Sequence, residues 1–195
     1  HTFTGPGGTL LSTVSPPSGD GVSGATAKGG GGGVVSVNGP RATMTTTPTV
    51  NAYISAVSLI ADGSVSIIAD SNTSSKSYAN TGGGGLVAVG EADAFTFVNS
   101  ANTNAYVGTS SRISAGNDFV LKVDSDHYLE AEGRSVGGGA VAVNDVDTRA
   151  RLNFNNRAYI GEGAVVEALD AAGIYANSSS FGKTRSYSES WGLGA

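Results

Sequence analysis

The residues of this chain that could do chemistry are few and acidic. Two aspartate pairs, Asp124 with Asp126 and Asp145 with Asp147, each stand two residues apart, and His127 follows the first pair directly. Carboxylates two apart on a β-strand share a face, and with a third oxygen ligand they can hold Ca²⁺. These four aspartates are therefore candidate metal ligands, with solvated turn residues as the competing interpretation.

No known catalytic motif accompanies these side chains. The chain has no GxSxG, no HExxH and no GxxxxGK[ST] sequence, and its glycine blocks lack the aspartate of calcium-binding nonapeptides. We predict that the protein is not an enzyme and uses no cofactor. The alternative is a β-helix polysaccharide lyase or hydrolase, which would have to act through Asp124, Asp126 or His127.

The residues around these positions recur at a nearly constant interval. Three tyrosines that follow Ala and precede Ile or Val are 53 residues apart, namely Tyr53, Tyr106 and Tyr159. The last glycine before each apolar run keeps almost the same period, at Gly33, Gly85, Gly139 and Gly192. Self-similarity at such a period is typical of solenoids, propellers and arrays.

The composition favours strands and turns over helices. The chain has 30 Gly, no Cys and only 14% charged residues, with Val, Ile, Leu and Ala set among Ser, Thr and Asn. Good helix formers are scarce, and β-branched residues favour strands. The absence of cysteine excludes disulfides and thiolate metal sites.

We predict an all-β fold, a parallel β-helix (β-solenoid), in which each 53-residue unit holds two coils of short strands. Strands about 4.8 Å apart would then give a rise of roughly 9.6 Å per unit. Equivalent inward residues should stack in ladders. The two expected ladders are Val35/Val37 with Val87/Val89 and Val141/Val143, and Ala52/Ile54 with Ala105/Val107 and Ala158/Ile160.

The repeated tyrosines and glycines then acquire positions. Tyr53, Tyr106 and Tyr159 should project outward as an interaction surface for sugar or protein, or as a packing row. Gly33, Gly85, Gly139 and Gly192 should form a structural corner, where glycine permits a positive φ or a close approach of another backbone.

The chain is expected to be a single solenoid segment with two parts. Residues 1–48 contain all five prolines and should be irregular, although Leu10–Val14 matches residues 65–69 one period later. Residues 49–195 should be regular repeats. Because the repeat is cut at both ends, we interpret the chain as a fragment of a longer one.

The net charge of −5 and a pI near 4.8 argue against a nucleic-acid partner. No apolar run approaches the roughly 18 residues of a membrane-spanning helix, so no membrane insertion is expected. The partners that remain are neighbouring copies of the same chain or repeat, and host or matrix glycans.

One stretch resembles a known group of proteins. The sequence GGGAVAVNDVDTRARLNFNNRAYIGEGAVVEALDAAGIYANSSS, which begins at Gly137, is similar to the repeats of giant secreted bacterial adhesins and exoproteins of the filamentous-haemagglutinin and fusobacterial leukotoxin type. The likeness covers most of residues 50–195, and residues 1–48 depart from it. It implies a right-handed parallel β-helix outside the cell.

The function expected from architecture and resemblance together is mechanical. The chain should be a structural or adhesive segment of a fibre on the bacterial cell surface, acting as a stiff stalk with repeated contact surfaces. A self-assembling extracellular filament subunit, whose open coil ends pair with the next chain, is the first alternative.

Overall fold

A computed structural model describes residues 2–5, 10–14 and 22–192, with side chains from residue 23 onward. This part of the chain forms β-strands and no helix. The strands are β1 (Thr2–Gly5), β2 (Leu10–Val14), β3 (Val22–Asn38), β4 (Arg41–Thr46), β5 (Thr49–Ile54), β6 (Ser58–Ala61), β7 (Val65–Val107), β8 (Arg112–Ala115), β9 (Phe119–Ile160), β10 (Val165–Ala168) and β11 (Ala172–Trp191).

Two very long strands, β7 and β9, lie at the centre of the fold. They pair in parallel along almost their whole length, and each residue of β7 faces its equivalent one unit later, as Tyr106 faces Tyr159. On its far side β9 pairs with β11, while β2, β3, β4 and β5 pair with β7. The predicted all-β class is confirmed, and the long parallel strands are compatible with a β-helix.

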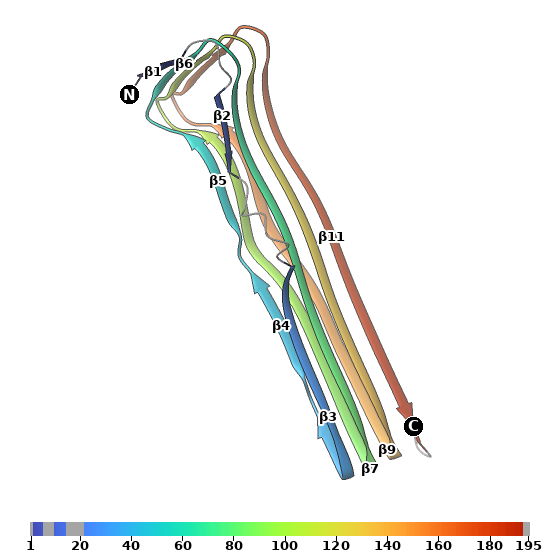
Figure 1. Cartoon of the computed structure of the whole chain (residues 1–195). Coiled ribbons are helices and arrows are strands. Elements are labelled where there is room, and N and C mark those ends of the chain that lie inside the picture. Colours follow the sequence, from blue (N-terminus) through green and yellow to red (C-terminus); the bar gives the residue numbers. More distant parts are fainter. Residues whose placement is uncertain (1, 6–9, 15–21, 193–195) are drawn as a thin grey trace.

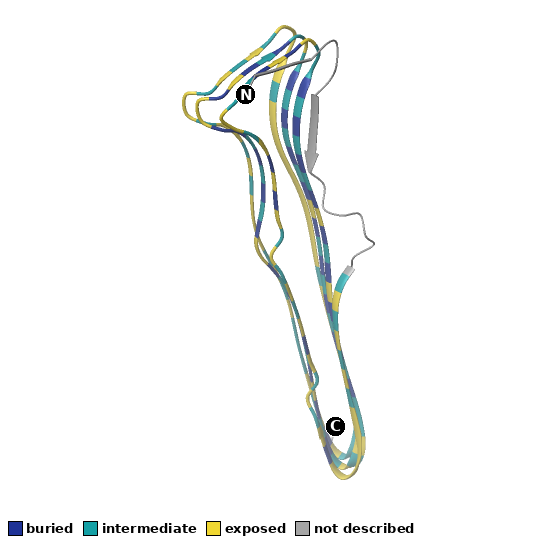
Figure 2. Cartoon of the chain, turned by 60° about the vertical axis from the view of Figure 1, so that its left-hand side comes forward, coloured by how far each residue is buried: buried dark blue, intermediate teal, exposed yellow. Residues whose placement is uncertain are grey.

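Each unit of the chain forms one layer of the stack. Within a layer the chain runs along the molecule, turns at the glycine block, and returns, so that β7 and β9 each fold back at their middle (Figure 1). The opposite end is a wider, three-sided loop, where β1, β6, β8 and β10 form a second small parallel sheet (Figure 2). Strand β2 pairs with residues 65–69, which confirms the predicted correspondence.

The prediction of two coils per unit is wrong. Residues one unit apart are direct hydrogen-bonded neighbours, so each unit contributes a single layer and a rise of about 4.8 Å. The physical reason is that the two long halves of one unit lie opposite each other in the same layer, with their inner faces in contact. They do not lie one above the other as two coils would. The hydroxyls of Ser77 and Thr96, one from each half, lie 2.7 Å apart across the interior.

The apolar core lies in the wide end of the layers. Large side chains from successive layers are fully buried there, including Ile67, Leu121 and Ile113. The predicted alanine ladder belongs to this core, because Ala52 and Ala105 are buried and Ala158 packs against them. Burial of each large side chain of this core, such as Ile67 or Leu121, contributes roughly 1.5–3 kcal/mol to stability.

The narrow part of each layer has a different interior. Beyond a small cluster of Val98, Ala101 and Leu129, its buried apolar residues toward the glycine block are alanines, such as Ala79 and Ala94, which alternate with serine and threonine. Two strands that approach this closely leave room only for small side chains. The interior therefore changes along each strand from large apolar residues to small ones, which is visible as a change in width in Figure 2.

The predicted inward valine ladder is wrong for this reason. Val35, Val37, Val141 and Val143 are 62%, 71%, 47% and 56% exposed, and the small residues between them, such as Ala142, face inward. The narrow interior accepts the alanine or serine of each pair, and the valines take the outer face. The division of the chain at residue 48 stays a prediction.

Candidate interaction surfaces

The three repeated tyrosines form a continuous stack on the outer face. Tyr53 and Tyr106 have ring centroids 5.0 Å apart, and Tyr106 and Tyr159 have centroids 5.1 Å apart, with nearly parallel planes. Their spacing is therefore about half of the roughly 9.6 Å expected for two coils per unit. The shorter spacing between the rings follows from the single layer that each 53-residue unit contributes.

This stacking limits what the tyrosines can bind. Both faces of the Tyr106 ring are covered by its neighbours, and each outer ring has one face covered. Tyr53 and Tyr159 remain 54% and 42% exposed. Ring edges and hydroxyls are offered to solvent along the stack, and among the described residues each of the two outer rings has one face without an aromatic neighbour.

The outward valines form a second surface that sequence reasoning missed. We call it the valine stripe, and it comprises the positions Val35, Val37, Val87, Val89, Val141 and Val143. Pairing places these residues side by side across three layers, next to the glycine corner. The sequence held one usable clue, since a smaller residue stands between the two valines of each layer.

The glycine corner brings backbones of successive layers close together. A Cβ added at Gly85 would meet the carbonyl of Gly33, one added at Gly139 would meet that of Gly85, and one at Gly192 would meet that of Gly139. Gly33 also has a φ of 147°, which side-chain-bearing residues rarely adopt. The corner therefore depends on the missing side chain in every layer.

The candidate metal ligands lie on the outer face and have other partners. Asp124 pairs with Lys122 at 2.6 Å and accepts a hydrogen bond from Asn177 at 2.9 Å. Partial burial raises the pKa of Asp124, but the hydrogen bonds from Lys122 and Asn177 outweigh it and hold that pKa below its usual range. Asp147 pairs with Arg149 at 2.6 Å.

The two aspartate pairs do not come together as a metal centre. Within the described ranges, no group of three or more His, Cys, Asp or Glu side chains is placed to hold a metal ion. Asp145 instead accepts a hydrogen bond from the backbone N–H of Val146, at 2.9 Å. The carboxylates of Asp124, Asp145 and Asp147 thus take part in local ion pairs and hydrogen bonds.

His127 is separated from its acidic neighbour by the pleat of the strand. The imidazole is 3% exposed inside the layer stack, whereas Asp126 next to it is exposed on the opposite face. The ring centroids of His127 and Phe154 are 5.5 Å apart, and neither imidazole nitrogen has a hydrogen-bond partner among the described residues. Burial lowers the pKa of His127, and the carboxylate of Asp126 opposes that shift only in part.

A network of charges and rings covers the outer face of β9 and β11. Glu130 lies 3.3 Å from the ammonium of Lys76 and 3.6 Å from that of Lys183, and it accepts a hydrogen bond from Tyr128. The Tyr128 ring stacks on Phe181 at 5.5 Å. Burial raises the pKa of Glu130, but the bonds from Tyr128 and Lys76 lower it further than burial raises it.

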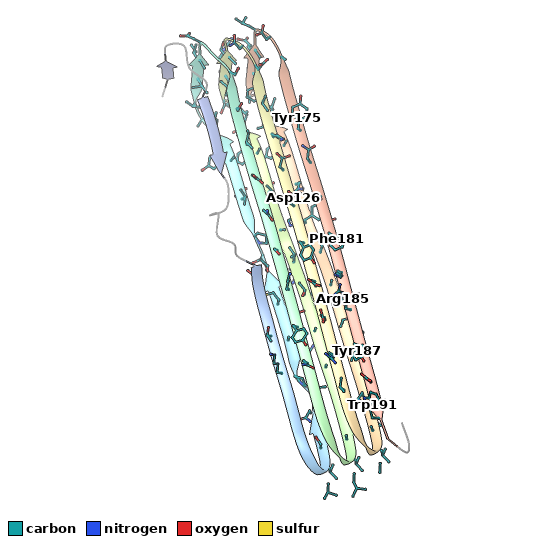
Figure 3. The ribbon with its side chains drawn as sticks, turned by 45° about the vertical axis from the view of Figure 1, so that its right-hand side comes forward. Asp126, Tyr175, Phe181, Arg185, Tyr187 and Trp191 are labelled. Atoms are coloured by element: carbon teal, nitrogen blue, oxygen red, sulfur yellow. The ribbon has the colours of Figure 1, made fainter. Side chains whose placement is uncertain are left out.

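This network was also missed at the sequence level. Its members come from three different units, and only the pairing of Lys76 with Glu130 and of Tyr128 with Phe181 unites them. The clue in the sequence was alternation, because the aromatic residues of β11 all occupy odd positions. Figure 3 labels these aromatic side chains of β11, which are Tyr175, Phe181, Tyr187 and Trp191.

Comparison with known proteins returned no relative. No family model matches the chain, and neither curated proteins nor solved structures include a match. No helix in the described part of the chain has the length and apolar character needed to cross a membrane.

Proposed function

We propose that this chain is a structural segment of an extracellular bacterial surface fibre, built as a right-handed parallel β-solenoid. One observation carries the proposal: every layer repeats the path of the one before it, in register over some 40 residues of β7 and β9. Solenoids of this kind gain stability from contacts between neighbouring repeats, so the number of repeats can change without changing the fold.

The side chains support a mechanical role. Equivalent residues stack between layers as tyrosines, as the Asn51 and Asn104 amides, and as glycine backbones. Each long half-layer of about 20 residues extends for about 66 Å, and each layer adds only about 4.8 Å of height. The resulting fibre is a broad, flat blade, stiff across its width, whose outer ladders supply repeated contact surfaces.

The proposal is tested by changing the number of layers. Variants carrying two, four or eight extra copies of residues 109–161, inserted after Gly161, are imaged by cryo-electron microscopy. We expect single particles whose height along the stack increases linearly, by about 4.8 Å per added copy. Separate globules, or particles whose height ignores the copy number, would contradict a structural array.

A self-assembling filament subunit is the second candidate, and one observation favours it. Strand β11 covers only the first half of β9, so along residues 140–160 the outer edge of β9 has no strand neighbour among the described residues. Unpaired edges template further strands. In the same images, a stack height that rises with protein concentration would identify self-assembly, whereas a constant height would identify a passive segment.

A further inference from the structure

Four aromatic side chains stand in a line on the outer face of β11. We call them the β11 aromatic row, and they are Tyr175, Phe181, Tyr187 and Trp191. All four occupy odd-numbered positions of one strand, and side chains an even number of residues apart on a strand point to the same side. That side is the outer one, because Ile174 on the other parity pairs with the fully buried Leu121. Figure 3 shows the row extending down the strand.

The rings of this row are exposed and held in place. Their exposed fractions are 52% for Tyr175, 56% for Phe181, 47% for Tyr187 and 62% for Trp191. Tyr175 lies over Gly173, since a Cβ at that glycine would be 2.5 Å from the ring. The Arg134 guanidinium lies 5.1 Å from the Tyr187 ring centroid.

Of the remaining two rings, Phe181 packs on a ring of the layer beneath and Trp191 stands over a glycine. Phe181 stacks on Tyr128 by one face, and 56% of the residue stays exposed. Trp191 stands beside Gly138, which has no side chain to cover it. The row therefore differs from the Tyr53–Tyr106–Tyr159 stack, in which the rings cover one another.

Polar groups separate the rings, and both cations of β11 itself have carboxylate partners. Lys183 lies 3.6 Å from Glu130, and Arg185 lies 3.9 Å from Glu132. The Tyr187 hydroxyl donates a hydrogen bond to Glu189. A hollow of about 710 Å³ adjoins this part of the row, lined by residues 132–134 and 184–187. Paired cations favour an uncharged ligand over a polyanion.

We infer that the β11 aromatic row binds an uncharged linear polysaccharide along the strand. Sugar rings present an apolar C–H face that stacks on aromatic rings, and their hydroxyls bond to carboxylates, amides and guanidinium groups. Tyr175 and Trp191 are 16 residues apart, a span of about 53 Å along a strand, which suits an extended polymer. The hollow beside Tyr187 and Arg185 seats one part of that polymer.

Other partner classes fit the row less well. A protein interface has a continuous apolar centre, whereas here polar and charged residues separate each ring from the next. A nucleic acid needs unpaired cations for its phosphates, and Lys183 and Arg185 have carboxylate partners. Separate aromatic platforms with hydrogen-bonding groups between them suit a chain of sugars.

This inference rests on the proposed structural role and names the partner of one of its surfaces. The full chain is run in native gels that each contain one soluble polysaccharide: hydroxyethylcellulose, galactomannan, arabinoxylan, or heparin as the polyanion. We expect retardation by at least one of the three neutral polymers. The double variant Tyr187→Ala/Trp191→Ala should bind that polymer at least about tenfold more weakly.

Two controls separate binding from folding. Tyr187→Phe keeps the ring and should bind within about twofold of the native chain, and Tyr53→Ala removes a ring outside the row and should do the same. Far-ultraviolet circular dichroism checks that each variant keeps its strands. No retardation by any neutral polymer, retardation by heparin alone, or equal binding of the double variant would overturn the inference. If the stack height still increases with added layers in the insertion variants, the proposed structural role stands and only this inference is lost.

Discussion

Two valines of β9 lie on opposite faces of the same strand and should respond differently to the same change. Val123 is fully buried, and Val143 is 56% exposed in the valine stripe. Val123→Thr places a hydroxyl in an apolar core and should lower the free energy of unfolding by about 1–3 kcal/mol. Val143→Thr should change it by less than about 0.5 kcal/mol. Urea unfolding measures both, and equal losses would contradict the outward stripe.

The buried imidazole of His127 makes stability depend on pH. Burial lowers its pKa in the folded chain, so between the ordinary value and the folded value only the unfolded chain binds the proton. The free energy of unfolding should therefore fall as pH is lowered below about 6.5, by at most about 1.4 kcal/mol per pH unit.

The measurement is a series of urea titrations between about pH 7.5 and 5.5, above the range in which most carboxylates titrate. His127→Leu is the matched variant, because it removes the titrating group and keeps an apolar side chain against Phe154. It should lose most of the pH dependence in this window. If the native chain and the variant give parallel pH profiles, His127 is not the responsible group.

At the scale of elements, the tyrosine stack links three strands. Tyr106 makes two ring contacts and Tyr53 makes one. Because an aromatic pair contributes about 0.5–1.5 kcal/mol beyond area burial, Tyr106→Ala should destabilise the chain more than Tyr53→Ala by about that amount. Tyr106→Phe keeps both contacts and should be nearly neutral. Equal losses in the two alanine variants would show that the stack adds nothing.

The glycine corner offers a second test at this scale. A Cβ at Gly139 would meet the backbone of the neighbouring layer, whereas a Cβ at Gly182 would meet nothing within 4 Å. Gly139→Ala should therefore lower the free energy of unfolding by about 1–3 kcal/mol through overpacking. Gly182→Ala should leave it unchanged or raise it by about 0.4–1 kcal/mol. Thermal unfolding of the two variants ranks them, and the reverse order would exclude the close approach.

At the scale of the whole molecule, one layer should be removable as a unit. Deleting residues 109–161 joins Gly108 to Glu162. Glu162 stands one 53-residue period after residue 109, so each side of the junction keeps a neighbour equivalent to its native one. We expect a folded chain that unfolds cooperatively with a smaller urea m-value, since less surface is exposed on unfolding. Deleting residues 109–150 is the matched control, and it should prevent folding because inward and outward positions no longer stack.

The layered shape also determines where a ligand could meet the molecule. Interior space is filled by large side chains at the wide end and by alanine, serine and threonine at the narrow end. The stack exposes long surfaces to solvent, and these surfaces run along the strands (Figure 2). Contact with a polymer lying along a strand, as proposed for the β11 aromatic row, follows from this shape.

The sequence by itself determined the period, the all-β class and the equivalence of positions. Tyr53, Tyr106 and Tyr159 are adjacent because identical residues at identical intervals must occupy the same place in successive layers. It also determined the alanine ladder of the wide end, where alternation of apolar and polar residues is clear.

Only the tertiary structure decided how many layers each unit makes, and which face the valines take. Alternation shows that two sets of residues face opposite ways, but not which set faces inward. At Val143 and Ala142 the width of the interior made that choice, since the opposite half of the layer leaves room only for the smaller side chain. The Lys76–Glu130–Lys183 contacts likewise depend on pairing between distant units, which no local pattern specifies.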